Sequence, residues 1–200
     1  MYPSFYNDVE KITLYDPLSD FLGAFDHGII EYCYLDVVKS AGHSCPTVAG
    51  AYLVTIKALQ ALYPDGVPER GNIHISMKDS LREGVTGVIS NVMSQITGAT
   101  ETSGFKGIAG KYVRHSLMDF DAEIQGQYRF TRKDSGESVE ISYQAIAPID
   151  SRQQALMQKI IMGAASDKEK KLFGQIWQQR VQAILIDFVD DPRLIQIKKM

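Results

Sequence analysis

The stretch AGHSCPTVAGAYLVTIKALQALYPDG, residues 41–66, decides the fold. From Pro46 onward its apolar residues recur at the spacing of a helix, and Pro64 and Gly66 interrupt the pattern. Proline suits the first position of a helix, because its missing N–H would have no partner there. The sequence therefore predicts a helix that begins at Pro46, with Cys45 at its N-cap.

The segments before this helix are expected to be shorter elements. Residues 1–27 predict an N-terminal helical arm. Ile29 to Tyr34 is apolar and β-prone, which indicates a strand. The next segment, DVVKSA, predicts a short helix that Asp36 caps and Gly42 ends.

The segments after the long helix mix both types of structure. The segment GNIHISMK, residues 71–78, alternates between apolar and polar residues, which predicts a strand with one buried side. Ser80 and Glu83 form a capping-box pattern, so a helix is expected to follow and to end at Gly98. A glycine-rich loop comes next. Residues 111–145 then indicate two or three strands with a hairpin turn at KDSGES.

From residue 151 the sequence becomes helical again. It has a second capping-box pattern from Ser166 to Glu169 and an amphipathic stripe from Leu172 to Phe188.

This order of elements lacks the regular strand–helix alternation of a doubly wound dinucleotide-binding domain, and it predicts an α+β fold. We expect residues 1–150 to form the α+β core. Residues 151–200 are expected to form a helical extension that packs on the core or on a partner copy.

The composition argues against several classes of partner. The net charge is −3 and the basic residues are scattered, so nothing favours nucleic acid. No apolar run is long enough to span a membrane, and the first residues do not resemble a signal peptide. The two cysteines, Cys33 and Cys45, are too few for a four-thiolate zinc site, and they suit a reduced cytoplasmic protein.

The pair His43 and Cys45 admits three roles. Imidazole nitrogen and thiolate sulfur bind zinc or a similar metal, for which His27 or His74 can supply a third ligand. Alternatively Cys45 is a nucleophile, since a helix N-terminus stabilises a thiolate and a nearby histidine accepts its proton. The third role is structural, with Cys45 packed at the start of the helix and His43 in a loop.

The glycine-rich loop TGATETSGFKGIAGK, residues 97–111, matches neither common phosphate motif. In a P-loop the Gly-Lys pair is followed by Ser or Thr, whereas Tyr112 follows it here, and Gly104 lies too far away. A dinucleotide fingerprint follows a strand, whereas this loop follows a predicted helix. The glycines indicate a turn with positive φ, and Lys111 at its exit is placed to reach a substrate anion.

Two of these motifs resemble the formylmethanofuran dehydrogenase E-like family. GHSCP with its AGAYL helix is similar to the family signature G-H-x-C-P-G. ITGAT, the glycine loop and GKYVRHSLMDF are similar to the family's T-G-C-T, loop and strand. The similarity spans about residues 36–120. It departs at Ala41 and Ala99, where the family commonly has histidine and cysteine, and the family's C-terminal zinc finger has no counterpart.

The resemblance implies an α+β core similar to the catalytic domain of glyceraldehyde-3-phosphate dehydrogenase. It also implies an intertwined homodimer. Carried over by position, the family's metal or active site falls on His43 and Cys45, with Lys111 as a further candidate.

The leading hypothesis is therefore a homodimeric protein that binds zinc or a similar ion. His43 and Cys45, with His27 or His74, would leave one coordination position open for water or a small anionic ligand. One rival is a metal-free enzyme in which Cys45 is the nucleophile, with His43 and Lys111 as further catalytic candidates. The other rival is a non-catalytic, dimeric metal-binding or scaffold protein.

Overall fold

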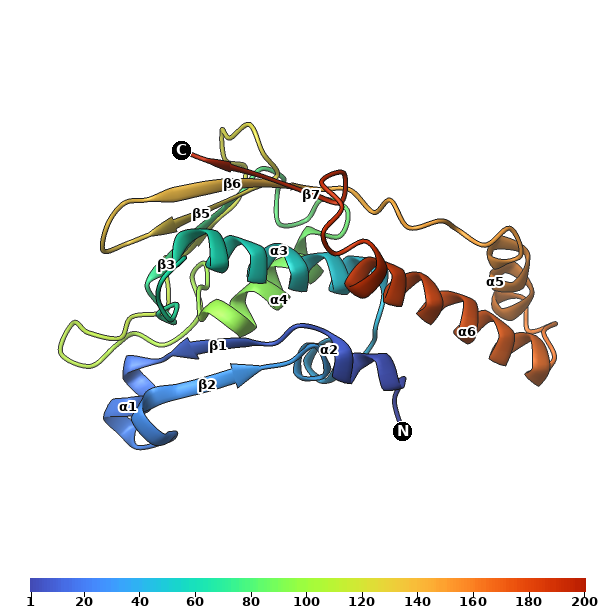
Figure 1. Ribbon diagram of the computed structural model, residues 1–200, viewed down its shortest axis with the longest axis horizontal. Coiled ribbons are helices and arrows are strands. Elements are labelled where there is room, and N and C mark those ends of the chain that lie inside the picture. Colours follow the sequence, from blue (N-terminus) through green and yellow to red (C-terminus); the bar gives the residue numbers. More distant parts are fainter.

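The computed structural model describes residues 1–200 and has an α+β architecture. Two helices, α3 and α4, lie between a five-stranded sheet and a two-stranded hairpin, and a pair of helices projects from one end of these layers (Figure 1). The helices are α1 (Pro17–Leu22), α2 (Tyr34–Ala41), α3 (Pro46–Leu62), α4 (Thr86–Thr97), α5 (Gln153–Ile161) and α6 (Asp167–Gln182). The strands are β1 (Ile12–Tyr15), β2 (Ile29–Tyr32), β3 (Ile73–Met77), β4 (Met118–Asp119), β5 (Tyr128–Arg132), β6 (Ser138–Tyr143) and β7 (Ile195–Lys199).

The helix α3 forms the centre of the core because it is apolar on almost every side. Leu53, Ile56 and Leu59 have no exposed surface. A helix that is hydrophobic all round is a buried one, and here strands of the sheet pack on one side while α2 and α4 pack elsewhere. As predicted, α3 begins at Pro46 and Cys45 is its N-cap. None of the helices combines the length and the apolar character needed to cross a membrane.

The main sheet has the strand order β4-β3-β5-β6-β7, and only β3 and β4 run parallel. Buried and half-buried residues alternate along β3, as its period-two pattern predicts. Ile75 pairs with Phe130, which pairs with Val139, and all three side chains belong to the core. The hairpin turn between β5 and β6 forms as predicted, with Gly136 at a φ of 77°.

The predicted N-terminal helical arm is wrong. This segment contains a short 3₁₀ helix (Ser4–Asp8) and the short helix α1, separated by the strand β1, which pairs antiparallel with β2, with Ile12 opposite Tyr32. Leu14 of β1 is fully buried. A run of only four alternating residues is too short for periodicity to separate strand from helix.

Two predicted helix starts are shifted. The N-cap of α2 is Cys33, whereas Asp36 lies in the first turn of the helix. The Oδ2 of Asp36 accepts the backbone N–H of Cys33 at 2.9 Å. The predicted capping box at Ser80 does not form, because α4 begins only at Thr86. Gly84, with a φ of 51°, breaks the helical path between them.

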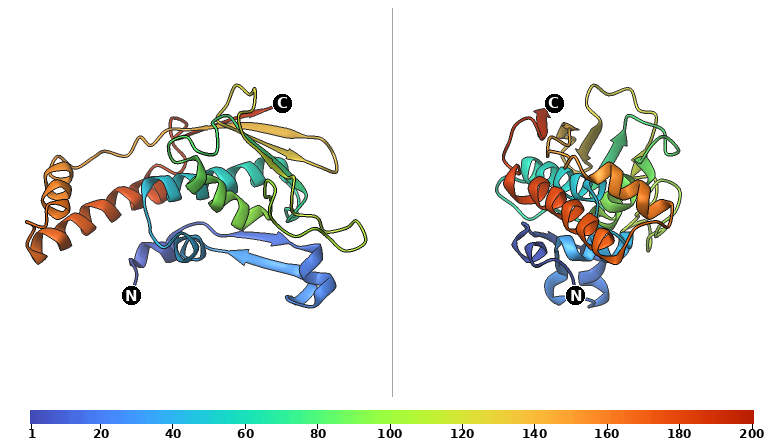
Figure 2. Two further views of the ribbon diagram at one scale, coloured as in Figure 1. Left: turned by 180° about the vertical axis from the view of Figure 1, so that it is seen from behind. Right: turned by 90° about the vertical axis from the view of Figure 1, so that its right-hand side faces the viewer.

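The C-terminal region is helical only in part. α5 and α6 form a hairpin that projects from the core (Figures 1 and 2), and Ser166 caps α6 as predicted. After α6, a π-helical turn (Ala183–Asp187) buries Ile184 and Leu185 in the core. The last strand, β7, then completes the sheet by pairing antiparallel with β6. The predicted helical extension thus ends in an edge strand of the sheet that is too short and too polar for its pattern to identify.

Candidate functional site

The C-terminal half of α6 lies beside the first turns of α3 (Figure 1). A cleft of about 830 Å³ is lined by residues of both segments. The connection between β3 and α4 and the end of β6 also line it. Both members of the predicted His-x-Cys site, His43 and Cys45, face this cleft. The site is therefore built from segments that lie far apart in the sequence.

Local hydrogen bonds orient His43 and Cys45. The Sγ of Cys45 accepts the backbone N–H of Val48 at 3.4 Å, in the place where a cap oxygen usually accepts. The Nδ1 of His43 lies 2.9 Å from the carbonyl oxygen of Ala41. Because a carbonyl only accepts hydrogen bonds, neutral His43 carries its hydrogen on Nδ1, which leaves a lone pair on Nε2 to take up a proton.

The residue between them, Ser44, is held by α6 and α2. The indole N–H of Trp177 donates to the Ser44 carbonyl at 3.0 Å, and Nε2 of Gln178 donates to the same oxygen at 3.2 Å. The Ser44 hydroxyl lies 2.9 Å from the hydroxyl of Tyr34 and donates to Oε1 of Gln178 at 3.2 Å. Contacts from two helices thus fix the backbone on both sides of Ser44.

Tyr143, at the end of β6, covers the first turns of α3. Its ring fits there because Gly50 has no side chain: a Cβ at that position would meet the ring at 2.4 Å. The Tyr143 hydroxyl donates to the carbonyl oxygen of Pro46 at 3.2 Å. Burial raises the pKa of Tyr143, and the charge of Arg180 opposes this rise only in part. Tyr143 therefore remains a neutral phenol at physiological pH.

Arg180 brings a positive charge to the cleft without a carboxylate partner. Its side chain lines the cleft and forms no ion pair, and its Nε is buried without a hydrogen-bond acceptor. A guanidinium has five N–H donors, so Arg180 has donors available for an anionic group.

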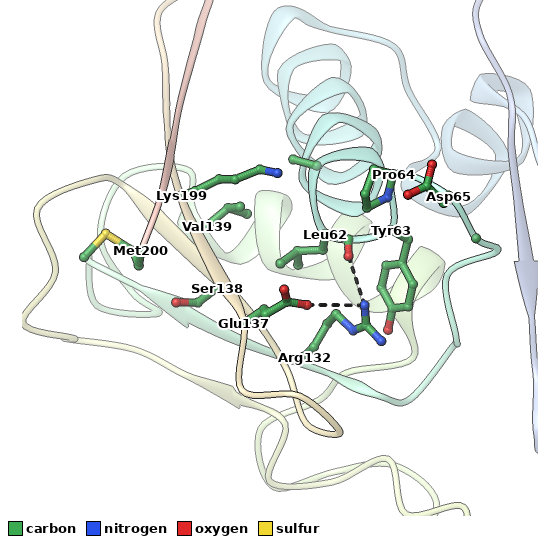
Figure 3. A pocket seen from close by; sticks show the side chains of 12 residues that line it. Leu62, Tyr63, Pro64, Asp65, Arg132, Glu137, Ser138, Val139, Lys199 and Met200 are labelled. Carbon is green, nitrogen blue, oxygen red and sulfur yellow. Dashed lines mark hydrogen bonds and ion pairs between the residues drawn. The ribbon is translucent and has the colours of Figure 1, made fainter.

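Arg132, in contrast to Arg180, has its guanidinium held by hydrogen bonds and ion pairs within the protein (Figure 3). It lines a separate cavity of about 440 Å³ at the C-terminal end of α3. Its Nη1 donates to the Leu62 carbonyl at 3.1 Å, its Nη2 pairs with Asp134 at 2.7 Å, and its guanidinium lies over the Tyr63 ring. These contacts close the end of α3, so this arginine has a structural role.

The start of α4 gives the cleft a mixed electrostatic character. Asp79 and Glu83 line the cleft, and neither forms an ion pair with Lys or Arg. Val85, the N-cap of α4, offers no side-chain acceptor to the first N–H groups. Because α3 also begins at the cleft, the positive ends of two helices meet there.

The other predicted site residues lie elsewhere. His27 is exposed in a turn between α1 and β2, and His74 on β3 pairs with Asp119, with Nε2 and Oδ1 3.1 Å apart. Lys111 lines a different cavity, beside the exit of the glycine-rich loop. No three His, Cys, Asp or Glu side chains are grouped to hold a metal ion. The single chain therefore does not bring the predicted metal ligands together.

Three residues of the cleft, Tyr143, Trp177 and Arg180, were missed by the sequence analysis. The amphipathic pattern of α6 shows which of its faces is apolar, but not which segment packs against that face. The only available signal is that Trp177 is the one tryptophan of the chain. In comparisons with known proteins, the chain matches no family and no curated protein.

Proposed function

We propose that the cleft binds a small ligand through an anionic group such as a carboxylate, and that Cys45 attacks this ligand as a nucleophile. The observation that carries the proposal is that the Cys45 thiol and the unpaired Arg180 guanidinium line one cleft. A guanidinium with free donors binds a carboxylate through charge-assisted hydrogen bonds. Asp79 and Glu83 favour a ligand whose other end is polar or cationic.

The reaction class that these groups support is acyl transfer. His43 Nε2 takes the proton of the Cys45 thiol, and Sγ attacks the carbonyl carbon of an ester or thioester. The S–C bond forms as the carbonyl π electrons move to oxygen, where the N–H of Thr47, in the first turn of α3, stabilises the charge. The carbonyl then re-forms, and the leaving group departs with the proton from His43. Water releases the acid and restores the thiol, so the steps balance without an oxidant or reductant.

Cys33 provides an internal control for this proposal. Both cysteines are half-buried N-cap residues. Cys33, however, donates its thiol hydrogen to the Asp36 carboxylate at 3.1 Å, so its thiol is already engaged with a side chain of its own helix. Cys45 instead accepts an N–H at the start of α3.

Iodoacetamide labelling of the native protein at pH 7, read by peptide mass spectrometry, tests the nucleophile. We expect Cys45 to react about tenfold or more faster than Cys33. The Cys45→Ser variant should keep the slow reaction of Cys33 alone. Equal rates at the two cysteines, or a Cys45 rate no higher than that of glutathione, would overturn the proposal.

A metal-dependent form of the site is the second candidate. The observation that favours it is that His43 and Cys45 share the cleft with Asp79 and Glu83, which are all ligand types for zinc. Since these side chains are not grouped around one point in the single chain, the hypothesis requires them to move or a second copy to contribute. Elemental analysis tests it: stoichiometric zinc that is lost in Cys45→Ser supports a metal site, and equal metal content in both proteins contradicts one.

We also propose that the protein is a cytoplasmic homodimer related to the formylmethanofuran dehydrogenase E-like family. Two free cysteines suit a reducing compartment. The projecting α5–α6 hairpin carries Ile161 and Met162, which are 77% and 79% exposed and would be covered by a second copy. Light scattering should give the mass of a dimer, and replacing both residues by serine should give a monomer. A monomeric native protein would contradict this assembly.

A further inference from the structure

We propose that a second cavity, at the other end of α4 from the Cys45 cleft, binds the phosphate group of a small phosphorylated ligand. The cavity has a volume of about 300 Å³, at the lower end of the range for small-molecule sites. Four cationic side chains line it, and Glu69 is its one acidic lining residue. The cations are Arg70, Lys111, Arg114 and Lys133.

Arg114 is the central observation because it is buried and incompletely paired. Arg114 is only 5% exposed. Its guanidinium donates one hydrogen bond to the protein, from Nη2 to Asp16 Oδ1 at 2.6 Å. Its Nε is buried without an acceptor. A buried donor without a partner is costly, so an additional acceptor beside this guanidinium stabilises the protein.

The backbone makes room for this guanidinium. Gly71 has a φ of 86°, and a Cβ at that position would lie 1.4 Å from Nη1 of Arg114. No residue with a side chain fits here without displacing Arg114. The position of the guanidinium beside the cavity thus depends on a glycine at residue 71.

The charges around the cavity are not balanced. Asp16 is a single carboxylate shared between Arg114 and Arg70, and its Oδ1 also accepts the N–H groups at the start of α1. Each guanidinium nitrogen of Arg70 makes a hydrogen bond, because Arg70 also donates to the Ile96 and Gln95 carbonyls at the end of α4. One excess positive charge therefore remains on this arginine pair.

The two lysines extend this excess to the mouth of the cavity. Lys111 forms no ion pair, and Lys133 makes only a 3.5 Å contact with the Gly71 carbonyl. Arg114 and the lysines come from two separate segments and surround one space, as the several oxygens of a phosphate require. Burial raises the pKa of Glu69, and the charge of Asp134 adds to this rise. The one carboxylate that would repel a phosphate in this cavity is therefore easier to protonate than an exposed glutamate.

Calorimetric titration with inorganic phosphate, at constant ionic strength set by sodium chloride, tests the proposal. The native protein should bind phosphate. Lys111→Ala and Lys133→Ala should each weaken binding roughly tenfold, since each removes one charge-assisted contact. Lys171→Ala, at an exposed lysine on α6, should change nothing. Glu69→Gln should strengthen binding several-fold, a gain that a folding defect cannot produce.

Further variants locate the site. Cys45→Ser and Arg180→Met should leave phosphate binding intact, because they alter the other cleft. Arg114→Met should abolish binding while circular dichroism remains native; if that variant does not fold, the lysine and Glu69 variants decide. The proposal is overturned by absent phosphate binding, by wild-type affinity in both lysine variants, by loss of binding in Arg180→Met, or by equal affinity for malonate.

Discussion

The indole N–H of Trp177 donates to the backbone carbonyl of Ser44 across 3.0 Å, and so joins α6 to the residue between His43 and Cys45. The two residues are 133 positions apart in the sequence. Gln178 adds a second donor to the same oxygen. The helix that carries Arg180 into the cleft therefore also fixes the backbone of the candidate nucleophile.

Trp177→Phe tests this link, because it keeps an aromatic ring and removes the donor. One lost hydrogen bond should lower the free energy of unfolding by about 1 kcal/mol, since Gln178 still serves the Ser44 carbonyl. The iodoacetamide rate of Cys45 relative to Cys33 should fall as Ser44 loosens. Gln179→Met, at an exposed neighbour that makes no contact with Ser44, should alter neither quantity. A native labelling ratio in Trp177→Phe would show that the bond does not position Cys45.

Local patterns predict the elements of this fold better than their ends or their assembly. The helix α3 was identified from Pro46 at its first position and from apolar residues that recur at helical spacing. The same pattern placed Cys45 at its N-cap. By contrast, the strands β1 and β7 are four and five residues long. Such short strands are defined by the neighbours they pair with, and those pairings do not show in the local sequence.

Only those residues of the candidate site that lie close together in the sequence were predictable. His43 and Cys45 are close in sequence, so one motif contains both. Arg180 and Tyr143 reach the cleft through the packing of α6 and β6 on α3, which no local pattern encodes. His27 and His74 were expected as ligands from residue type alone, and the fold places them elsewhere.

Gly50→Ala should destabilise the protein although alanine is the better helix former. Alanine favours a helix over glycine by about 1 kcal/mol, but its Cβ would meet the Tyr143 ring at 2.4 Å. Overpacking of a tight core costs about 1–3 kcal/mol, so we expect a net loss in the free energy of unfolding. Gly174→Ala on α6 is the matched control, because a Cβ there meets nothing within 4 Å. It should stabilise the protein by up to about 1 kcal/mol, and equal effects at the two glycines would refute the packing argument.

Glu140 makes stability depend on pH in the acid range. It is 3% exposed, it accepts the Gly126 N–H at 2.8 Å, and it pairs with Arg129. These contacts hold its pKa below the ordinary value. The carboxylate therefore contributes fully to stability above about pH 4.3, and this contribution is lost as the pH falls through the lowered folded-state value.

Glu140→Gln should remove this contribution. We expect a loss of about 2 kcal/mol at pH 7, because hydrogen bonds to a charged group are replaced by bonds to a neutral one. Urea unfolding between pH 7 and pH 3 should show the gap between variant and native protein narrowing as the pH falls. Glu123→Gln, at an exposed residue without an ion pair, should follow the native curve. A gap that stays constant with pH would contradict the assignment.

Arg180→Met should change how the cleft distinguishes charged from neutral reagents. Iodoacetate and iodoacetamide carry out the same alkylation, but only iodoacetate is anionic. A positive charge in the same cleft as Cys45 should raise the iodoacetate rate by about three- to tenfold over the rate without that charge. We therefore expect Arg180→Met to lower the iodoacetate rate of Cys45 by that factor and the iodoacetamide rate much less. Lys171→Met, which removes a charge from the exposed side of the same helix, should leave the ratio unchanged.

If the ratio for Arg180→Met equals that of the native protein, the carboxylates of Asp79 and Glu83 control the field at Cys45. The proposal of an anionic ligand then fails, even if Cys45 itself proves reactive.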